Sequence, residues 1–240
     1  MISISKLLCD LDAEGDGLRY DDGRDSAREQ ITEDRTTKPV VVWNLTRRCN
    51  LYCQHCYAGA DLDAAPGELT TAEGKQLLDE LADYGVPVVL FSGGEPLVRD
   101  DLEELVAHAA DAGIRPVLST NGTLATPERA AALREAGLKY AGVSVDGMPE
   151  RNDEFRGQEG AFDAALRGIQ ACLDADLKTG LRYTITKHNA DDLEAIVSML
   201  HEEGLDRFCF YHLDYGGRGD EIRDVDLTPE QRREAVETVC

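Results

Sequence analysis

The chain has 240 residues, of which 42% are hydrophobic, enough for the buried core of one large domain or two small ones. It carries 47 Asp and Glu against 25 Lys and Arg, and the formal net charge of −22 argues against a broad basic surface that binds nucleic acid or an anionic membrane. No apolar run approaches the ~18 residues of a transmembrane helix, and the first ten residues lack the pattern of a signal peptide.

Residues 12–38 are rich in Asp, Gly, Arg and Thr and have almost no apolar period, which predicts a partly flexible N-terminal lead-in over residues 1–38. From residue 39 onward strand-like and helix-like patterns alternate, and we assign residues 39–240 to one core domain. The predicted strands cover residues 40–44, 88–91, 116–120, 140–145, 181–186 and 207–212. The predicted helices cover residues 70–84, 100–112, 127–136, 161–175, 191–203 and 228–240.

Capping residues mark two of the predicted helix starts. Thr70 opens a Thr-Thr-Ala-Glu sequence typical of a capping box, and Thr126 precedes Pro127, a favoured first helical residue. Six strand–helix units in series predict a parallel sheet, either doubly wound or barrel-like, with a ligand at the carboxyl ends of its strands. The last helical pattern reaches Cys240 without a C-cap, which suggests a fragment or a truncated chain.

Three of the seven cysteines fall within eight residues, at Cys49, Cys53 and Cys56. The odd number and the scatter of the other four argue against a secreted disulfide framework and favour a reducing cytoplasm, where such a cluster of thiols indicates a metal site. The other four are Cys172 and Cys209, which we expect in the core, and Cys9 and Cys240, to which we assign no role.

Three thiolates on one loop indicate a soft metal. Structural zinc takes four ligands, but His55 is too close in sequence to the cysteines, and no second cysteine pair follows within ~20 residues. An iron–sulfur cluster held by three thiolates, with one iron open to an exchangeable ligand, fits the spacing better, and zinc stays the alternative.

Polar residues and glycines gather where the predicted strands end, and helices show no such concentration. These groups are Ser92-Gly93-Gly94-Glu95-Pro96, Thr120-Asn121-Gly122, Ser144-Val145-Asp146-Gly147 and Tyr211-His212. Because the carboxyl ends of parallel strands meet at one rim, the pattern predicts a site over that rim.

Residues 46–57 resemble the CxxxCxxC motif of the radical S-adenosylmethionine (SAM) superfamily, and residues 92–96 resemble its GGEP motif. The resemblance covers about residues 38–230 and implies an α/β fold, a partial (β/α)6 TIM-type barrel. It also implies that Cys49, Cys53 and Cys56 bind a [4Fe-4S] cluster whose fourth iron takes the amino and carboxylate groups of SAM. Reductive cleavage of SAM then gives a 5′-deoxyadenosyl radical that takes a hydrogen atom from the substrate.

The same resemblance assigns SAM-binding roles near the cluster. Gly93 and Gly94 are expected to let backbone approach the methionyl group, and Glu95 to accept a hydrogen bond from its ammonium. A plain turn is the alternative for this motif. His55 stands where the family has an aromatic residue beside adenine, so we expect it to pack and to orient backbone rather than to bind iron.

Later strand ends supply four weaker candidates. Ser144 and Asp146 resemble ribose contacts, with a Ser-x-Asp-Gly turn as the alternative. Asn121 is a further candidate SAM contact, and Arg182 either meets the SAM carboxylate or pairs with a surface acid. Residues 153–162 resemble the loop after the fourth strand in the peptide- and haem-modifying branch, where we expect them to support the fold.

Residues 2–9, 17–20, 38–44 and 210–219 resemble the haem-biosynthesis branch of the superfamily. This branch includes the deacetylase of the sirohaem-dependent route, the iron-coproporphyrin decarboxylase and a related enzyme that makes a dioxo-haem. The implied substrate is a carboxylated iron tetrapyrrole, altered by didecarboxysirohaem deacetylation or iron-coproporphyrin decarboxylation. Arg156, Arg218 and Arg223 are candidate carboxylate forks. His212 is a candidate contact to iron or a propionate, against a plain hydrogen-bonded barrel residue.

Two further classes of function stay open: a radical SAM maturase that modifies a peptide (SPASM-type), and a non-catalytic iron–sulfur or zinc protein on the same scaffold. Relatives of the haem branch usually continue into a C-terminal extension with more cysteines, so we expect a second Fe-S cluster, if there is one, in a C-terminal region missing from this sequence. An electron donor such as ferredoxin or flavodoxin is also expected.

The acidic, Lys-poor composition favours a halophile with a salt-rich cytoplasm, over an ordinary acidic cytosolic protein. We expect His108, His188 and His201 to be solvated.

Overall fold

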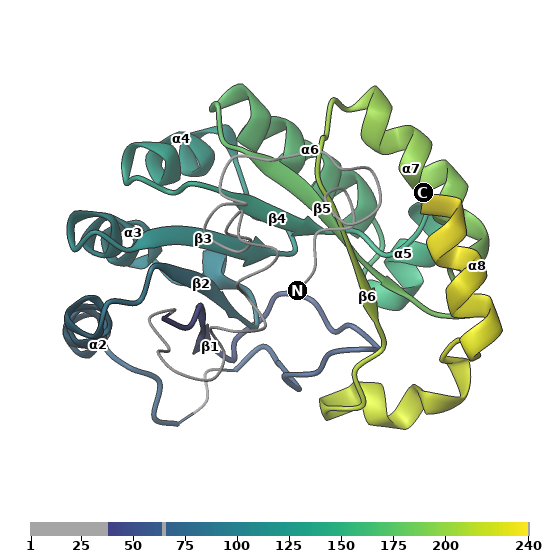
Figure 1. The fold of residues 1–240 in the computed structure, drawn as a ribbon, viewed down its shortest axis with the longest axis horizontal. Helices are drawn as coiled ribbons and strands as arrows, with labels where there is room; N and C mark the ends of the chain where they lie inside the picture. Colours follow the sequence, from purple (N-terminus) through teal and green to yellow (C-terminus); the bar gives the residue numbers. More distant parts are fainter. Residues whose placement is uncertain (1–37, 64–65, 240) are drawn as a thin grey trace, which may run out of the picture.

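The computed structural model describes residues 38–63 and 66–239 (Figure 1). Almost all of the expected lead-in, with Cys9 and Cys240, lies outside these residues. Six parallel strands form one sheet in the order β1-β2-β3-β4-β5-β6. The strands are β1 (Val41–Thr46), β2 (Val88–Gly93), β3 (Arg115–Thr120), β4 (Ala141–Ser144), β5 (Thr179–Ile185) and β6 (Phe208–His212).

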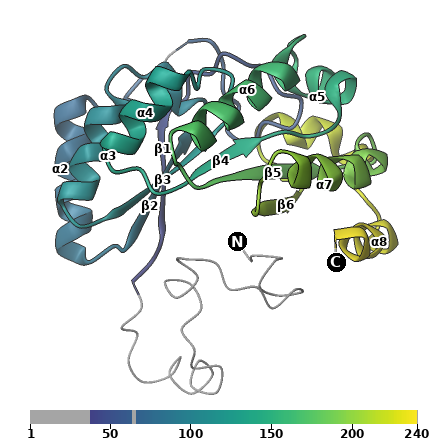
Figure 2. The same cartoon turned by 90° about the horizontal axis from the view of Figure 1, so that it is seen from above.

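Helices connect each strand to the next, and η4 and α8 follow the last strand. They are α2 (Thr71–Tyr84), α3 (Leu102–Asp111), α4 (Pro127–Glu135), α5 (Pro149–Arg156), α6 (Ala161–Asp174), α7 (Leu193–Glu202) and α8 (Pro229–Val239), with short 3-10 helices η2 (Pro96–Val98), η3 (Ala190–Asp192) and η4 (Gly217–Val225). Because right-handed crossovers between sequential neighbours place the connecting helices on the same face, the sheet is not doubly wound. Figure 2 shows α2, α3, α4 and α6 along one side of the strands. The predicted partial (β/α)6 barrel is therefore confirmed.

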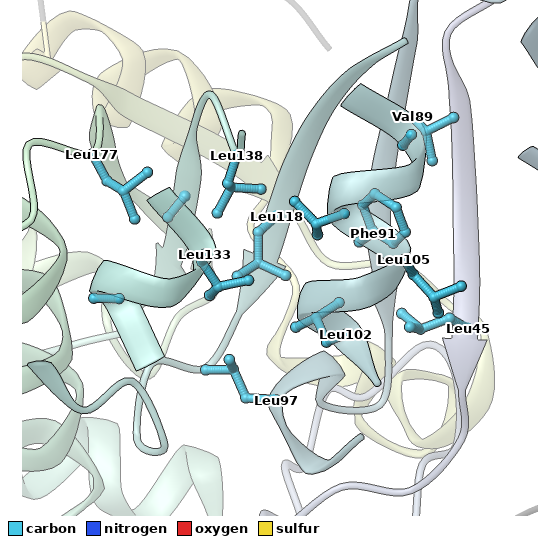
Figure 3. Packing of buried hydrophobic residues seen from close by; sticks show 14 of the residues in the cluster. Leu45, Val89, Phe91, Leu97, Leu102, Leu105, Leu118, Leu133, Leu138 and Leu177 are labelled. Carbon is cyan, nitrogen blue, oxygen red and sulfur yellow. The ribbon is translucent and has the colours of Figure 1, made fainter. Parts of the chain in front are cut away.

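The outer face of the sheet packs against the helices. Phe91 of β2 and Leu118 of β3 are almost fully buried among leucines of α3 and α4 (Figure 3). A second cluster surrounds Tyr183 of β5 and Ile169 of α6. Alternate strand residues point to opposite faces, so burial of this outer set leaves the other set for the inside of the barrel.

The inner face changes from apolar to polar along the strands. Val88, Leu90 and Val117 form a small apolar cluster with Tyr140. Further toward the carboxyl end of β2, Ser92 borders a cavity. Apolar side chains therefore fill one end of the barrel, and polar groups lie at the rim where the sequence predicts a site.

Local signals placed most elements correctly. Thr70 and Glu73 form the predicted capping box, and Thr126 caps α4 by accepting a hydrogen bond from the backbone N–H of Arg129. Cys172 is buried in the core as predicted, whereas Cys209 of β6 is only half-buried.

The expected surface histidines lie on the surface. His108 pairs with Asp79 at 2.7 Å, and His188 and His201 are exposed. Within the described residues, no helix is long and apolar enough to cross a membrane.

One prediction about the fold is wrong. The first part of residues 153–162, predicted as a loop, forms the end of helix α5, which starts at Pro149 and stops at Gly157 in the left-handed conformation (φ 74°). The helix sequence PERNDEFR has no apolar stripe, so no period predicted it. Its buried residues are Asn152, Phe155 and Arg156, and their importance emerges only at the candidate site.

Candidate active site

The cysteine loop, residues 47–61, follows β1 and is tied at its base by backbone hydrogen bonds. The N–H of Cys49 donates to the carbonyl oxygen of Asp61 at 2.7 Å, and the N–H of Asp61 donates to that of Arg47 at 3.2 Å. The loop folds back on itself, so that Cys49, Cys53 and Cys56 lie in one cluster with Leu51 and Ala60. The structure thus brings the three predicted ligands together.

Arg218 of η4 holds the cysteine loop from the far end of the chain. Its Nε donates to the carbonyl oxygen of Cys53 at 2.8 Å and its Nη1 to that of Ala60 at 2.9 Å. The guanidinium carbon lies 3.8 Å from the centroid of the Tyr52 ring. A Cβ atom on the neighbouring Gly217 would stand 2.3 Å from the carbonyl oxygen of Cys56, so only glycine permits this close approach.

These contacts correct the prediction of carboxylate forks. The guanidinium of Arg218 serves the protein's own carbonyl groups, although its Nη2 is buried without a hydrogen bond. Arg223 pairs with Asp220 and lies 4.9 Å from the centroid of the Tyr215 ring. Neither arginine lines the cavity described below.

Gly93 and Gly94 allow β2 to run close to the start of the cysteine loop. The N–H of Gly94 donates to the carbonyl oxygen of Thr46 at 2.7 Å. A Cβ on Gly93 would lie 2.3 Å from that oxygen, and a Cβ on Gly94 would lie 2.1 Å from the carbonyl oxygen of Arg48. The space left by the missing side chains is therefore filled by backbone of the cysteine loop. Both glycines also border the cavity, so their predicted contact with SAM stays a prediction.

Glu95 ties the end of β2 to the end of β3. Its Oε1 accepts hydrogen bonds from Thr120 Oγ1 at 2.6 Å and Leu97 N at 3.0 Å, and its Oε2 accepts from Asn121 N at 2.6 Å. Burial raises the pKa of Glu95, although these donors act in the opposite direction. The side chain is fully buried and does not line the cavity, so the structure gives it a positioning role. Its predicted bond to an ammonium group stays a prediction.

Each cysteine sulfur accepts hydrogen bonds from neighbouring N–H groups. Leu51 N lies 3.4 Å and Asn121 Nδ2 lies 3.9 Å from Cys49 Sγ. The donor to Cys53 Sγ is Arg156 Nη1 at 3.8 Å, and that to Cys56 Sγ is Ala60 N at 3.4 Å. Burial nevertheless raises the pKa of the Cys49 thiol to about 11, so metal binding at neutral pH must displace its proton.

A buried ionic group lies beside Cys53. Arg156 pairs with Asp146, and His55 Nε2 lies 3.2 Å from Asp146 Oδ2. The His55 ring stacks on Phe155 with centroids 4.2 Å apart, which agrees with the packing role predicted for this histidine. Burial alone raises the pKa of Asp146, but Arg156 and then His55 outweigh it and hold the pKa below its usual value.

This group bears on two predictions. Asp146 is fully buried, pairs with Arg156, accepts a hydrogen bond from Thr184 N at 2.6 Å and does not line the cavity, and its ribose contact stays a prediction. Arg156 lines the cavity but is already paired, so it is not a free carboxylate fork.

A cavity of about 370 Å³ opens beside the cysteine loop and lies within the range of roughly 300–1,000 Å³ typical of small-molecule sites. Its wall brings together the predicted residues Cys49, Cys53, Cys56, His55, Gly93, Gly94, Asn121, Ser144 and Arg182, and also His212. Lining residues that had no predicted role include Ser119, Thr184, Tyr211 and Asp214. Ser119 and Thr184 occupy inward positions of predicted strands, and strand alternation was the available signal for them.

The donor set fits an iron–sulfur cluster better than one zinc ion. Three cysteine thiols border the cavity, one fewer than the four ligands that structural zinc takes. A [4Fe-4S] cluster places its thiolates on different irons and so takes a wider spread of sulfurs. The three thiols border a cavity with room for a further ligand.

The fold and the site define an α/β-barrel protein whose rim carries a three-cysteine loop beside a small-molecule cavity. Residues 43–200 match the Radical SAM superfamily. The chain belongs to this superfamily, a class of enzymes that implies a [4Fe-4S] cluster and SAM as cofactors.

Two relatives and one solved structure illustrate the likeness. The Fe-coproporphyrin III synthase of Methanosarcina barkeri is 53% identical over 100% of this chain and 60% of its own length. The pre-heme d1 synthase of Dinoroseobacter shibae is 44% identical over 84% of this chain and 50% of its own length. Native anSMEcpe with bound AdoMet and Cp18Cys peptide superposes with a TM-score of 0.69 at 18% identity, over 83% of this chain and 58% of that one. The chain thus spans 50–60% of the length of these two relatives.

Proposed function

We propose that this chain is the cluster- and SAM-binding core of a radical SAM enzyme that modifies side chains of a carboxylated iron tetrapyrrole in haem biosynthesis. The observation that carries the proposal is the joint lining of one cavity by three cysteines, the glycines of the GGEP motif and Arg182. The likeness to relatives named for haem-related syntheses supports the substrate class.

In this proposal Cys49, Cys53 and Cys56 hold the cluster. When bound, the cluster and SAM supply hydrogen-atom abstraction from the substrate. Asn121 and Leu51 orient the sulfur of Cys49, while Arg218 and the two glycines keep the loop closed against β2. Ser144 and His55 border the cavity where the nucleoside part of SAM is expected.

A carboxylated substrate or the SAM carboxylate needs a cation in the cavity. Arg182 of β5 lines it, and its guanidinium lies 5.0 Å from the centroid of the Tyr211 ring. A side-chain hydrogen bond also links Arg182 to Tyr211, and in this proposal the guanidinium donates to a carboxylate of SAM or of the substrate. His212 lies at the same rim and is a second candidate for a propionate or for iron.

Anaerobic reconstitution with iron and sulfide tests the proposal. The expected product is a brown protein that cleaves SAM to 5′-deoxyadenosine in the presence of a strong reductant, faster when didecarboxysirohaem or iron-coproporphyrin is added. Cys53→Ala is expected to lose the iron and the cleavage. Cys172→Ala, which removes a buried thiol that does not line the cavity, is the matched control and is expected to keep both.

Three outcomes contradict parts of the proposal. A colourless protein with one zinc ion rules out the enzyme and supports a non-catalytic metal protein. Full SAM cleavage by Cys53→Ala contradicts the assignment of Cys53 as a cluster ligand. SAM cleavage that responds to neither tetrapyrrole, but to a peptide, supports a peptide-modifying maturase. A second Fe-S cluster, a ferredoxin or flavodoxin donor and a cytoplasmic location stay predictions.

A further inference from the structure

Arg156 occupies a position that the fold defines closely. It is the last residue of α5, and only 8% of it is exposed. The helix end is fastened to the cysteine loop because Gln54 N donates to the carbonyl oxygen of Phe155 at 2.9 Å. A Cβ on Gly157 would lie 2.5 Å from the carbonyl oxygen of Tyr52, so backbone meets backbone directly. The guanidinium therefore has little freedom to move away from the loop.

The partners of Arg156 aim it at one sulfur atom. Asp146 pairs with one edge of the guanidinium and is itself held by Thr184 N and His55. The other terminal nitrogen, Nη1, lies 3.8 Å from Cys53 Sγ. Asp146 thus fixes the orientation of Arg156, whose two terminal nitrogens contact the carboxylate and the sulfur respectively.

The three cysteines differ in the charge of their hydrogen-bond donors. Among the described residues, the donors to Cys49 and Cys56 are uncharged amides, whereas the donor to Cys53 is a cation. Hydrogen bonds to cluster sulfurs and nearby charge are the protein's means of setting a cluster's reduction potential.

We propose that Arg156 is a positioning residue that raises the reduction potential of the iron–sulfur centre held by Cys53 and so eases its one-electron reduction. This inference rests on the proposed function, since it requires the cluster. One electron passes from an external low-potential donor to the cluster, no bond forms or breaks, and no proton is transferred to Arg156. The cation stabilises the additional negative charge that the reduced centre spreads over its thiolates.

The test compares Arg156→Lys, Arg156→Gln and Arg156→Met in the reconstituted chain without SAM or substrate. The fraction of reduced cluster is measured by electron paramagnetic resonance at a series of fixed potentials. Lys keeps the charge and is expected to stay near the wild type. For Gln, which keeps only a neutral donor, we expect the ratio of reduced to oxidised cluster at a given potential to fall about tenfold, equivalent to 59 mV for one electron. For Met, which has no hydrogen-bond donor, we expect a still lower ratio of reduced to oxidised cluster at the same potential.

Arg151→Gln is the matched control. Arg151 lies on the same helix and pairs with Asp192 at 3.0 Å, without a described contact to a cysteine. Its variant is expected to titrate like the wild type. Iron and sulfide per chain are measured for every variant, so that only samples with the same cluster content are compared.

Equal titration curves for wild type, Gln and Met overturn the inference, as does a curve for Arg151→Gln displaced as far as that for Arg156→Gln. If the Arg156→Met variant does not bind a cluster, the test rests on whether Arg156→Lys keeps a larger fraction of reduced cluster than Arg156→Gln at the same potential. A wild-type chain that binds no cluster contradicts the proposed function itself, an outcome separate from equal potentials.

Discussion

The Nε atom of Arg218 donates a hydrogen bond to the carbonyl oxygen of Cys53 at 2.8 Å, across 165 residues of sequence. The same side chain donates to Ala60 and covers the ring of Tyr52. One arginine thus satisfies two carbonyl groups in a loop without regular secondary structure, and the loop's order depends on it.

We expect Arg218→Met to fold but to lose iron faster than the wild type. Two hydrogen bonds of about 1 kcal/mol each hold the loop closed, so their loss is expected to speed iron release to a chelator by roughly tenfold or more. Absorbance of the reconstituted protein after addition of EDTA measures this rate. Arg223→Met is the control, because Arg223 is mostly exposed and pairs with its neighbour Asp220 rather than with the cysteine loop. Equal rates for the two variants contradict the role of Arg218.

Gly94→Ala is expected to disturb the cysteine loop more than any ordinary surface change. The new Cβ meets the carbonyl oxygen of Arg48 at 2.1 Å, backbone that cannot rotate away. We expect a loss of about 3 kcal/mol in the free energy of unfolding, and less iron bound on reconstitution. Gly113→Ala is the comparison, because its φ of +81° adds a backbone penalty that Gly94 does not have, while no atom lies within 4 Å of the new Cβ. That variant is expected to cost about 1 kcal/mol and to bind iron normally, and urea unfolding with iron analysis distinguishes the two.

Asp101 makes one part of the stability depend on pH. The hydrogen bond from Arg99 lowers the pKa of this carboxyl below its usual value; burial opposes this, and a bond from Thr71 adds to it. A depressed pKa in the folded state means that the carboxylate stabilises the fold above the unfolded pKa of 3.8, and that this contribution disappears as pH falls through the folded value.

Asp101→Asn is therefore expected to be less stable than the wild type by about 1 kcal/mol at pH 7, a figure reduced for its partial exposure. The difference should shrink toward zero as pH falls below 3.8. Urea unfolding from pH 7 to pH 3 gives the curve. Asp100→Asn removes one charge from the exposed neighbouring residue, and a similar pH profile for both variants contradicts the assignment to the Arg99 contact.

The net charge of −22 predicts that salt stabilises the chain. Repulsion among surface acids reaches about 30 Å at 0.01 M salt and only about 3 Å at 1 M. We expect the Tm to rise by roughly 5 °C between these concentrations of KCl, equivalent to about 2 kcal/mol for a domain of this size. Potassium chloride is preferred to sulfate, which strengthens apolar burial regardless of charge. A Tm that falls with KCl contradicts the prediction of a salt-rich cytoplasm.

Elements with an apolar period were predictable from the sequence. Residues 88–91 and 116–120 lie in strands because their alternate side chains enter the core, and Thr126 with Pro127 begins a helix as predicted. The grouping of the cysteine loop with the GGEP motif at one rim also followed from strand ends alone. These features depend on neighbours a few residues apart or on the parallel topology.

The roles of charged residues could not be predicted in the same way. Arg156 and Asp146 are residue types that often contact a ligand, yet here the two buried side chains pair with each other. Whether an arginine meets a substrate or a carbonyl group depends on contacts such as that of Arg218, between residues far apart in sequence. Helix α5, which places Arg156, has no apolar stripe by which a sequence pattern reveals a helix.

The attachment of the cysteine loop to Arg218 also sets an order of events during synthesis. The loop leaves the ribosome early, but the arginine that closes it is made 165 residues after Cys53. At about 5–20 residues per second, the three thiols of a nascent chain stay without the contacts of Arg218 for roughly ten seconds or longer. Loading of the cluster is therefore expected to follow completion of the barrel, and thiol oxidation during translation is the competing fate of an unfinished chain.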